Sequence, residues 1–168
     1  KSLEIKESFI KYAQKTKEYL EDIKPVIKEK QEFFRKLAKR FYPNNASGIT
    51  VYPNEGENQQ RYTIEAKIES DNSDGINNVK IFCYDMTMLF KGHGHNVKFS
   101  FHDSRLFDGI DEKHKAEIFK VVNELFNGTD YQYIATVNQN QLNEVKSILT
   151  EQEYEEIIEQ NTILTLTD

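Results

Sequence analysis

VKFSFHD, residues 97–103, is the stretch from which the fold of this 168-residue chain can be argued. Apolar and polar residues alternate from Val97 to His102, which predicts a strand, and Asp103 follows at its carboxyl end. The alternation places Phe101 and His102 on opposite faces. A carboxylate at the tip of a parallel strand lies where open α/β sheets bind ligands and can hold a hydrated Mg²⁺. Asp also begins many ordinary turns, so this position alone supports both interpretations.

Downstream of this stretch, helical and strand patterns alternate along the chain. That order predicts parallel strands joined by crossover helices. The expected elements are a helix capped by Asp111 and stopped by Gly128, a strand at 131–137, a helix at 141–149, a helix begun by the capping box of Thr150 and Glu153, and a final β-rich segment at 162–167.

Upstream, the chain begins with a long helical region from Leu3 to Phe41. Pro25 lies inside this region and predicts a kink or a break near residues 23–24. Two antiparallel strands, at 49–52 and 62–68, and a helix at 76–90 are expected to follow. The first region also carries the heptad pattern of a coiled coil, in Ala13, Leu20, Ile27, Phe34 and Phe41.

These patterns together predict an α/β protein with two parts. Residues 1–42 form the helical end of a coiled coil, and residues 43–168 form an α/β lobe with a mixed, mostly parallel sheet. A chain with 38% hydrophobic and 30% charged residues has the composition of a globular domain, not of a disordered or collagen-like one. No apolar run is long enough to span a bilayer, so we expect no membrane contact.

The single cysteine, Cys83, cannot form an internal disulfide, which suits a reducing cytoplasm. Its place on an apolar helical stripe predicts a packed small hydrophobe, not a nucleophile. The net charge of −6 is unevenly distributed: residues 1–40 hold 12 basic and 7 acidic residues (+5), and the remainder holds 10 and 21 (−11). A basic arm can contact nucleic acid, but interspersed Glu and Lys favour a simple solvated helix face.

The order of the motifs is more informative than any one of them. Ser73-Asp74-Gly75 precedes a helix, Asp103 ends a strand, the turn at 107–111 precedes another helix, and a further strand follows. This order resembles the C-terminal half of the nucleotide-binding head of SMC-like (structural maintenance of chromosomes) ABC ATPases. More narrowly, it is similar to the uncharacterised domain at the C-terminal end of certain bacterial SMC-like proteins. The resemblance covers nearly the whole chain.

The resemblance implies roles in nucleotide binding for four residues. Ser73 and Gly75 would occupy the signature loop, which meets the γ-phosphate held by the opposite protomer. A hydroxyl, a glycine and a helix N-terminus all favour an anion, although Asp74 replaces a family glycine and adds an unfavourable charge. Asp111 would match the aspartate that touches the partner subunit, and its helix-capping role explains it equally well. Asn138 would stand near the switch position, where an amide can sense a phosphate without titrating.

The resemblance also implies a magnesium site and a question about hydrolysis. Asp103 would be the Walker B aspartate, which holds Mg²⁺ through water. Ser104 then stands where the family has the glutamate that polarises the attacking water, and serine is no general base near neutral pH without help. Hydrolysis would therefore be slow or would recruit another carboxylate such as Asp108.

The partners implied by the resemblance follow from what these residues lack. The 168 residues contain no Gly-x-x-x-x-Gly-Lys-Ser/Thr phosphate loop, which the family carries in an N-terminal lobe. ATP and Mg²⁺ are thus expected only with that lobe present, and the chain alone should not be an active ATPase. The family implies a homodimer formed around nucleotide, contact with DNA, and a DNA-related or defence process.

Two alternatives belong to other functional classes. All four histidines, His93, His95, His102 and His114, lie within 22 residues, and the first three with Asp103 would suit Zn²⁺ or Mn²⁺ in a metal-dependent hydrolase or nuclease. A loop location explains the cluster equally. The other alternative is a non-catalytic protein-interaction module that uses its aromatic residues, most of which are more simply core: Phe99, Phe101, Phe107, Tyr131 and Tyr133.

Overall fold

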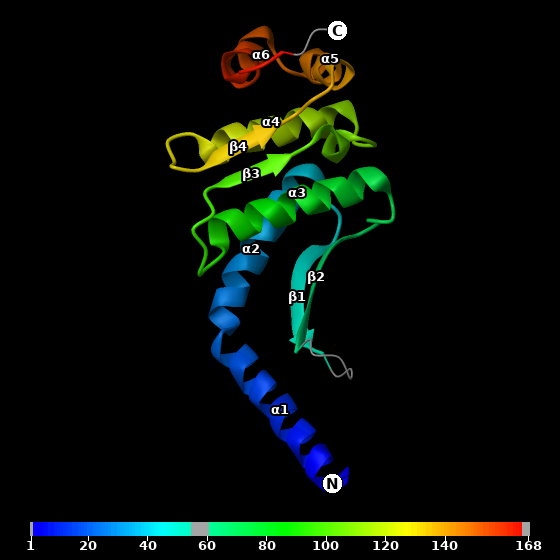
Figure 1. Ribbon diagram of the computed structural model, residues 1–168. Helices are drawn as coiled ribbons and strands as arrows, with labels where there is room; N and C mark the ends of the chain where they lie inside the picture. Colours follow the sequence, from blue (N-terminus) through cyan, green and yellow to red (C-terminus); the bar gives the residue numbers. More distant parts are fainter. Residues whose placement is uncertain (1, 55–60, 166–168) are drawn as a thin grey trace.

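The structure, a computed structural model, describes residues 2–54 and 61–165 (Figure 1). A helical arm leads into a layered lobe, and the arm consists of two helices, α1 (Ser2–Asp22) and α2 (Lys24–Phe41). The break at Ile23 confirms the prediction from Pro25, which lies in the first turn of α2. Proline is tolerated there because the first N–H groups of a helix have no intrahelical acceptor.

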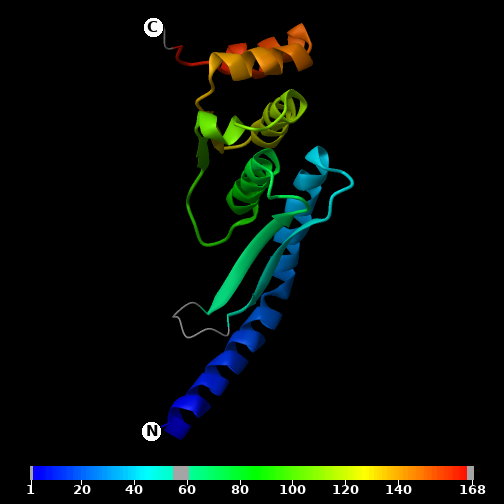
Figure 2. The same cartoon turned by 90° about the vertical axis from the view of Figure 1, so that its right-hand side faces the viewer.

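The hairpin of β1 (Ser47–Pro53) and β2 (Tyr62–Ile68) runs along the arm (Figures 1 and 2). The strands are antiparallel, as predicted, with a register from Ser47 opposite Ile68 to Pro53 opposite Tyr62. Ile49 and Ile68 are buried in the core, and Gln31 of α2 donates a hydrogen bond to the carbonyl of Ile49 at 2.7 Å. One face of the hairpin is therefore fixed against α2.

The lobe is built around a parallel strand pair. After α3 (Asp74–Lys91) come β3 (Phe99–His102), the short helix η1 (Ser104–Phe107), α4 (Glu112–Phe126) and β4 (Gln132–Ala135). The two strands pair in parallel from Phe99 opposite Gln132 to His102 opposite Ala135, and α4 lies in the crossover between them. The strand-helix-strand prediction is thus confirmed. Figure 2 shows α3 and α4 on the same side of this pair.

The chain ends with α5 (Gln139–Ile148), α6 (Glu151–Ile157) and η2 (Glu159–Asn161), which pack beyond α4. The predicted capping box begins α6: Glu153 accepts from the Thr150 N–H at 2.9 Å, and the Glu153 N–H donates to the Thr150 hydroxyl at 3.2 Å. The predicted last strand is wrong for residues 162–165, and its remainder lies outside the described residues. Thr162 instead bonds back to the Ile158 and Glu159 carbonyls.

One apolar core joins the arm to the lobe. Phe34 and Phe41 of the heptad pattern are buried in it, whereas Ala13 is exposed and Leu20 and Ile27 are only partly covered. The C-terminal half of the heptad stripe thus serves the lobe, and pairing of the other half in a coiled coil stays a prediction. The largest of the fully buried side chains in the core are Phe34, Phe82, Phe107, Ile68, Met86 and Ile118.

The mixed α/β class is confirmed, but the predicted single sheet is wrong for the residues described. They form two separate two-stranded sheets, one antiparallel and one parallel. The hairpin does not join β3 because it packs along α2, on the other side of α3 (Figure 2). Among the described helices, none is long and apolar enough to cross a membrane.

Candidate functional site

Asp103 lies directly after β3, at the carboxyl end of the parallel pair. Its Oδ1 atom accepts a hydrogen bond from the Arg105 N–H at 3.0 Å and so caps η1. This is the turn-starting role that the sequence allowed. The residue is exposed. Because a carboxylate has about four acceptor positions, capping leaves room for water or a cation.

The two predicted loops, Ser73-Asp74-Gly75 and 107–111, touch each other. Gly75 is buried in the first turn of α3, and a Cβ atom placed on it would lie 2.3 Å from the carbonyl oxygen of Gly109. Gly109 has a φ of +70°, a conformation that glycine adopts readily. The structure therefore gives Gly75 a packing role: only a residue without a side chain allows α3 to begin against this loop.

Asn78 of α3 holds the same loop through its side chain. Its Nδ2 group donates to the Arg105 carbonyl at 3.2 Å and to the Asp108 carbonyl at 2.9 Å. These carbonyls belong to η1 and its C-cap residue, and η1 begins directly after Asp103. The start of α3 is thus fixed to the segment that follows β3.

Gln141 joins a third element to this loop. Its side chain is 6% exposed, and its Nε2 group donates to the Ser104 carbonyl and to Asp108 Oδ1, both at 3.0 Å. Its Oε1 atom accepts from the Asn138 N–H at 3.0 Å, at the start of α5. The structure therefore brings Ser104, Asp108 and Asn138 together around one buried amide that the sequence analysis did not single out.

The remaining predicted residue of the first loop, Ser73, is the N-cap residue of α3. It is exposed, and its side chain makes no capping hydrogen bond. Asp74 follows in the first turn, where its negative charge favours the helix dipole. The carboxylate that disfavours phosphate thus stabilises the helix by itself. The hydroxyl of Ser73 lies beside it at the same helix terminus.

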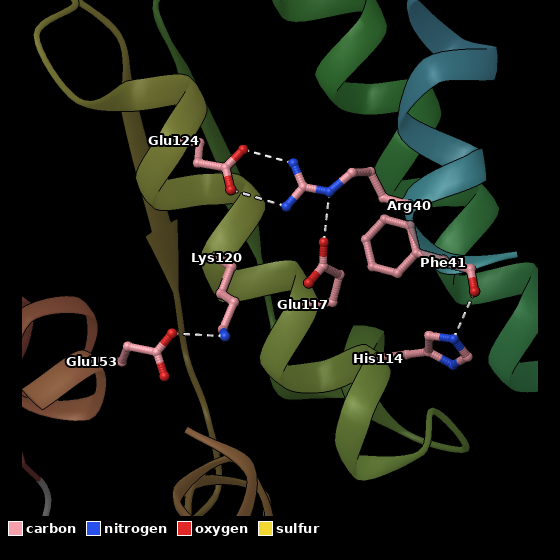
Figure 3. Close-up of polar contacts among 7 residues, drawn as sticks. All are labelled: Arg40, Phe41, His114, Glu117, Lys120, Glu124 and Glu153. Carbon is pink, nitrogen blue, oxygen red and sulfur yellow. Dashed lines mark hydrogen bonds and ion pairs between the residues drawn. The ribbon is translucent and has the colours of Figure 1, made fainter. Parts of the chain in front are cut away.

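Asp111 caps α4, as predicted, and also contacts a histidine. Its Oδ1 atom accepts from the His114 N–H at 3.0 Å, and its Oδ2 atom lies 2.5 Å from His114 Nδ1. Partial burial acts to raise the pKa of the Asp111 carboxyl, but these contacts with His114 outweigh it and lower the pKa. The other ring nitrogen, Nε2, is 2.8 Å from the Phe41 carbonyl at the end of α2 (Figure 3).

Arg40, next to Phe41, makes a second link between α2 and α4 (Figure 3). Its guanidinium contacts both oxygens of Glu124, at 2.6 and 2.9 Å, and its Nε atom donates to Glu117 at 2.6 Å. The fork geometry of arginine suits such a two-oxygen contact. These bonds raise the pKa of Arg40 and lower that of Glu124. The arm is therefore fastened to α4 by polar contacts as well as by the core.

The predicted histidine metal site is not supported by the described residues, among which no three His, Cys, Asp or Glu side chains are grouped to hold a metal. His95 Nε2 contacts the Met88 carbonyl at 3.1 Å, and His93 lies 3.9 Å from Glu29. His114 is part of the α2–α4 contact instead. The histidines are near in sequence but lie on different elements: His93 and His95 in the loop before β3, His102 at the end of β3, and His114 in α4.

His102 is withdrawn from any such site because both of its ring nitrogens are used inside the protein. It is 7% exposed, its Nε2 atom donates to Asp85 Oδ2 at 2.9 Å, and its Nδ1 atom lies 3.0 Å from the Tyr133 hydroxyl. Burial, and to a lesser degree the Asp85 charge, raises the pKa of Tyr133. Strand alternation therefore turns His102 into the core while Asp103 remains exposed.

The opposite face of β3 is exposed, so that two of the five aromatic residues expected in the core, Phe99 and Phe101, lie outside it. Phe99 and Phe101 are 55% and 53% exposed, and Val97 before them is half exposed. Phe107, by contrast, is fully buried. The sequence predicted the alternation correctly, but it did not reveal that the described residues cover only one face of the parallel pair.

Comparison with known families assigns most of the chain to one family. Residues 37–168 match the family described as an uncharacterised protein conserved in bacteria (DUF2326). The chain belongs to the DUF2326 family. The matched region of this DUF2326 protein begins within α2 and includes every residue of the candidate site. No curated protein matches the DUF2326 chain.

Among solved structures, the DUF2326 chain is similar to one described as "Structural biochemistry of ATP-driven dimerization and DNA stimulated activation of SMC ATPases". The TM-score is 0.46 at 13% sequence identity, and the match covers 78% of each chain.

Proposed function

We propose that this chain is the C-terminal lobe of an SMC-like ABC ATPase head and supplies the signature loop and the Walker B aspartate. The observation that carries the proposal is the contact between Gly75 and Gly109. It places two motifs that are more than thirty residues apart side by side, so that both the proposed signature loop and the loop after Asp103 can face a second copy. Gln141 adds Ser104, Asp108 and the start of α5 to the same loop.

In this proposal Asp103 holds Mg²⁺ through water when ATP is bound. Its place after a parallel strand and its exposure suit that role. Ser104 is half-buried and its backbone carbonyl accepts from Gln141; its hydroxyl, like that of any serine, is a poor general base near neutral pH. Asp108 is the first carboxylate that follows Ser104 in the sequence, and Gln141 also donates a hydrogen bond to its Oδ1 atom. We infer slow hydrolysis, with Asp108 orienting the attacking water.

The proposed N-terminal lobe covers the exposed face of β3. Parallel sheets are normally buried on both faces, and Phe99 and Phe101 provide apolar area for a second layer. The phosphate loop that this chain lacks comes from that lobe. A head completed in this way binds ATP and presents Ser73 and Asp111, both exposed, to a second copy.

The proposal includes dimerisation around nucleotide, with motion passed along α2 to the arm. The basic excess of residues 1–40 supports contact with DNA, because Lys and Arg release counterions from phosphates. The Arg40 contacts with Glu117 and Glu124 supply a rigid connection for such motion. A DNA-related or defence process is the setting we infer.

The test combines this chain with the N-terminal lobe of the full-length protein and measures ATP turnover. We expect turnover by the mixture, none by either part alone, and a loss of at least about tenfold in Asp103→Asn because magnesium is held less well. Asp130→Asn is the matched control, since Asp130 is exposed and forms a surface ion pair with the exposed Lys98 in the same lobe.

Two results would contradict the proposal. One is a complex that forms but neither binds nor hydrolyses ATP. The other is equal turnover in Asp103→Asn and Asp130→Asn, which would remove Asp103 from the nucleotide site. A complex that binds ATP and dimerises without turnover would retain the binding proposal and reject only the water-orienting role of Asp108.

A further inference from the structure

The imidazole of His114 lies between two groups that can only accept hydrogen bonds. Its Nδ1 atom is 2.5 Å from Asp111 Oδ2, and its Nε2 atom is 2.8 Å from the carbonyl oxygen of Phe41. The ring is about three-quarters buried and lies 4.6 Å, between centroids, from the ring of Tyr42. Figure 3 shows the histidine reaching from α4 to the end of α2.

The protonation state follows from this geometry. A neutral imidazole carries one N–H and can donate to one partner, whereas the imidazolium carries two and donates to both. An ionised carboxylate and a backbone carbonyl have no proton to offer in return. Both contacts are therefore satisfied together only when His114 is charged.

The groups around the ring do not provide another source of the proton. Burial, together with the Asp111 charge, raises the pKa of Tyr42 to about 12, and burial raises that of the Cys83 thiol on α3. Both groups stay neutral near pH 7, and the lowered pKa keeps Asp111 ionised there. Two neighbouring cations form ion pairs elsewhere, Arg40 with Glu117 and Glu124, and Lys115 with Glu144. Glu112 and Lys113 are exposed in the first turn of α4.

The two partners belong to different parts of the molecule. Phe41 is the last residue of α2, and Asp111 is the N-cap of α4, at the end of the loop whose Gly109 packs on Gly75. Phe41 itself is buried, so the arm stays attached through the core whatever the histidine does. Loss of one His114 bond would loosen only the last turn of α2 and the cap of α4.

We propose that charged His114 is a proton-dependent pin that ties the end of the arm to the loop at 108–111. Loss of its proton breaks one of the two bonds and frees that loop from the arm. Imidazole is the side chain whose ordinary pKa lies nearest to neutrality, which makes histidine the usual proton-dependent group in proteins. That the released loop faces a partner subunit rests on the proposed function; the pin itself does not.

The test is amide hydrogen exchange by NMR on the 168-residue chain without nucleotide, so it is independent of the proposed ATPase. Protection factors, which correct for the intrinsic effect of pH, are measured at the N–H groups of His114 and Lys115, which donate to Asp111. Between about pH 6 and about pH 8.5 we expect protection to fall about tenfold, the scale of one lost hydrogen bond to a charged group.

Matched variants separate the pin from other histidines. His114→Gln should remove the pH dependence, while His93→Gln, which alters an exposed histidine 3.9 Å from the carboxylate of Glu29, should retain it. If His114→Gln fails to fold, Asp111→Asn serves instead, because Asn still caps a helix but has no charge to hold the imidazolium. Nitrogen-15 spectra at about pH 6 should also show protons on both ring nitrogens of His114.

The pin is wrong if His114 carries a single ring proton at about pH 6. It is equally wrong if protection at the α4 cap does not change with pH, or if the change persists in His114→Gln.

Discussion

Gly75 and Gly109 are in contact although 33 residues separate them along the chain. The missing side chain of Gly75 makes room for the Gly109 carbonyl, to which a Cβ atom would approach within 2.3 Å. The obstacle is backbone, so it cannot move aside as a flexible side chain would. This contact fixes the distance between the start of α3 and the segment that follows β3.

Gly75→Ala should therefore destabilise the protein even though alanine is the better helix former. We expect a loss of about 1–3 kcal/mol in the free energy of unfolding because the added methyl group overpacks the contact. Gly48→Ala is the matched control, because nothing lies within 4 Å of its Cβ position, and its effect should stay within about 1 kcal/mol. Urea unfolding of both variants decides the matter, and equal stabilities would contradict the contact.

Gln141→Ala should also destabilise the protein, through unsatisfied polar groups. The substitution leaves the Ser104 carbonyl, Asp108 and the Asn138 N–H without their amide partner, at a cost of about 1–3 kcal/mol. Gln139→Ala, two residues earlier, removes only an exposed contact with Asn143 and should cost at most about 0.5 kcal/mol. Denaturant unfolding should show the difference, and similar losses would argue against a special role for Gln141.

Arg40→Lys should weaken the attachment of α2 to α4 by about 0.5–1 kcal/mol. Lysine keeps the charge but cannot reproduce the fork that contacts both Glu124 oxygens and Glu117. Arg35→Lys, at an exposed position of the same helix, serves as control. A double-mutant cycle with Glu124→Ala should give a coupling energy of similar size, and additive effects would show that the pair contributes nothing.

The contribution of Glu153 to the stability of α6 should depend on pH in the acid range. The Lys120 ion pair, together with the Thr150 N–H and hydroxyl, lowers the pKa of Glu153 from 4.5 to about 2 (Figure 3). A lowered carboxyl pKa stabilises the folded state above pH 4.5, and this contribution is lost as the pH falls toward 2. Glu153→Gln should reduce the slope of unfolding free energy against pH in this window, whereas exposed Glu155→Gln should change it less.

Phe99→Ser with Phe101→Ser should leave the stability of this chain nearly unchanged, because both rings are more than half exposed. The double variant should abolish binding of the proposed N-terminal lobe, which loses the apolar face it needs. Phe107→Ala, in the core, should instead cost about 3–5 kcal/mol. Calorimetry on the double variant Phe99→Ser, Phe101→Ser measures this binding, and an unaltered affinity would place the N-terminal lobe elsewhere.

The features that sequence patterns predicted well depend on neighbours along the chain. Pro25 located the break between α1 and α2, and Asp111 and Thr150 located two helix starts. Caps and breaks act within one helical turn, so their signals are local. The parallel pairing of β3 and β4 was predicted from the intervening helix, since parallel strands need a crossover.

The features that were missed depend on contacts between distant segments. Asn78 and Gln141 are polar residues on helices, and no local pattern indicates that their amides hold a loop from another part of the chain. The spacing of Asn138 and Gln141 is typical of a helix cap. It does not indicate that the Gln141 side chain also donates a hydrogen bond to Asp108. His102 and His93 are close in sequence, yet β3 turns His102 into the core, whereas the loop after α3 leaves His93 exposed.

The exposed aromatic residues show a different limit. Alternation in VKFSFHD correctly divided β3 into two faces, but it could not show which face the chain itself covers. Both faces carry residues typical of strands. The predicted single sheet was wrong for the same reason. Strand patterns do not reveal which strands pair, and here the hairpin packs on α2 and does not pair with β3.

The burial of Cys83 makes the wild-type protein a convenient background for thiol chemistry. Its side chain is inaccessible and burial raises the pKa of the thiol, so maleimide reagents will leave it unmodified in the native state. A fluorophore or spin label attached to one introduced surface cysteine would then report from that place alone. The angle between arm and lobe can be followed without first removing the native sulfur, which would disturb the packing that holds α3.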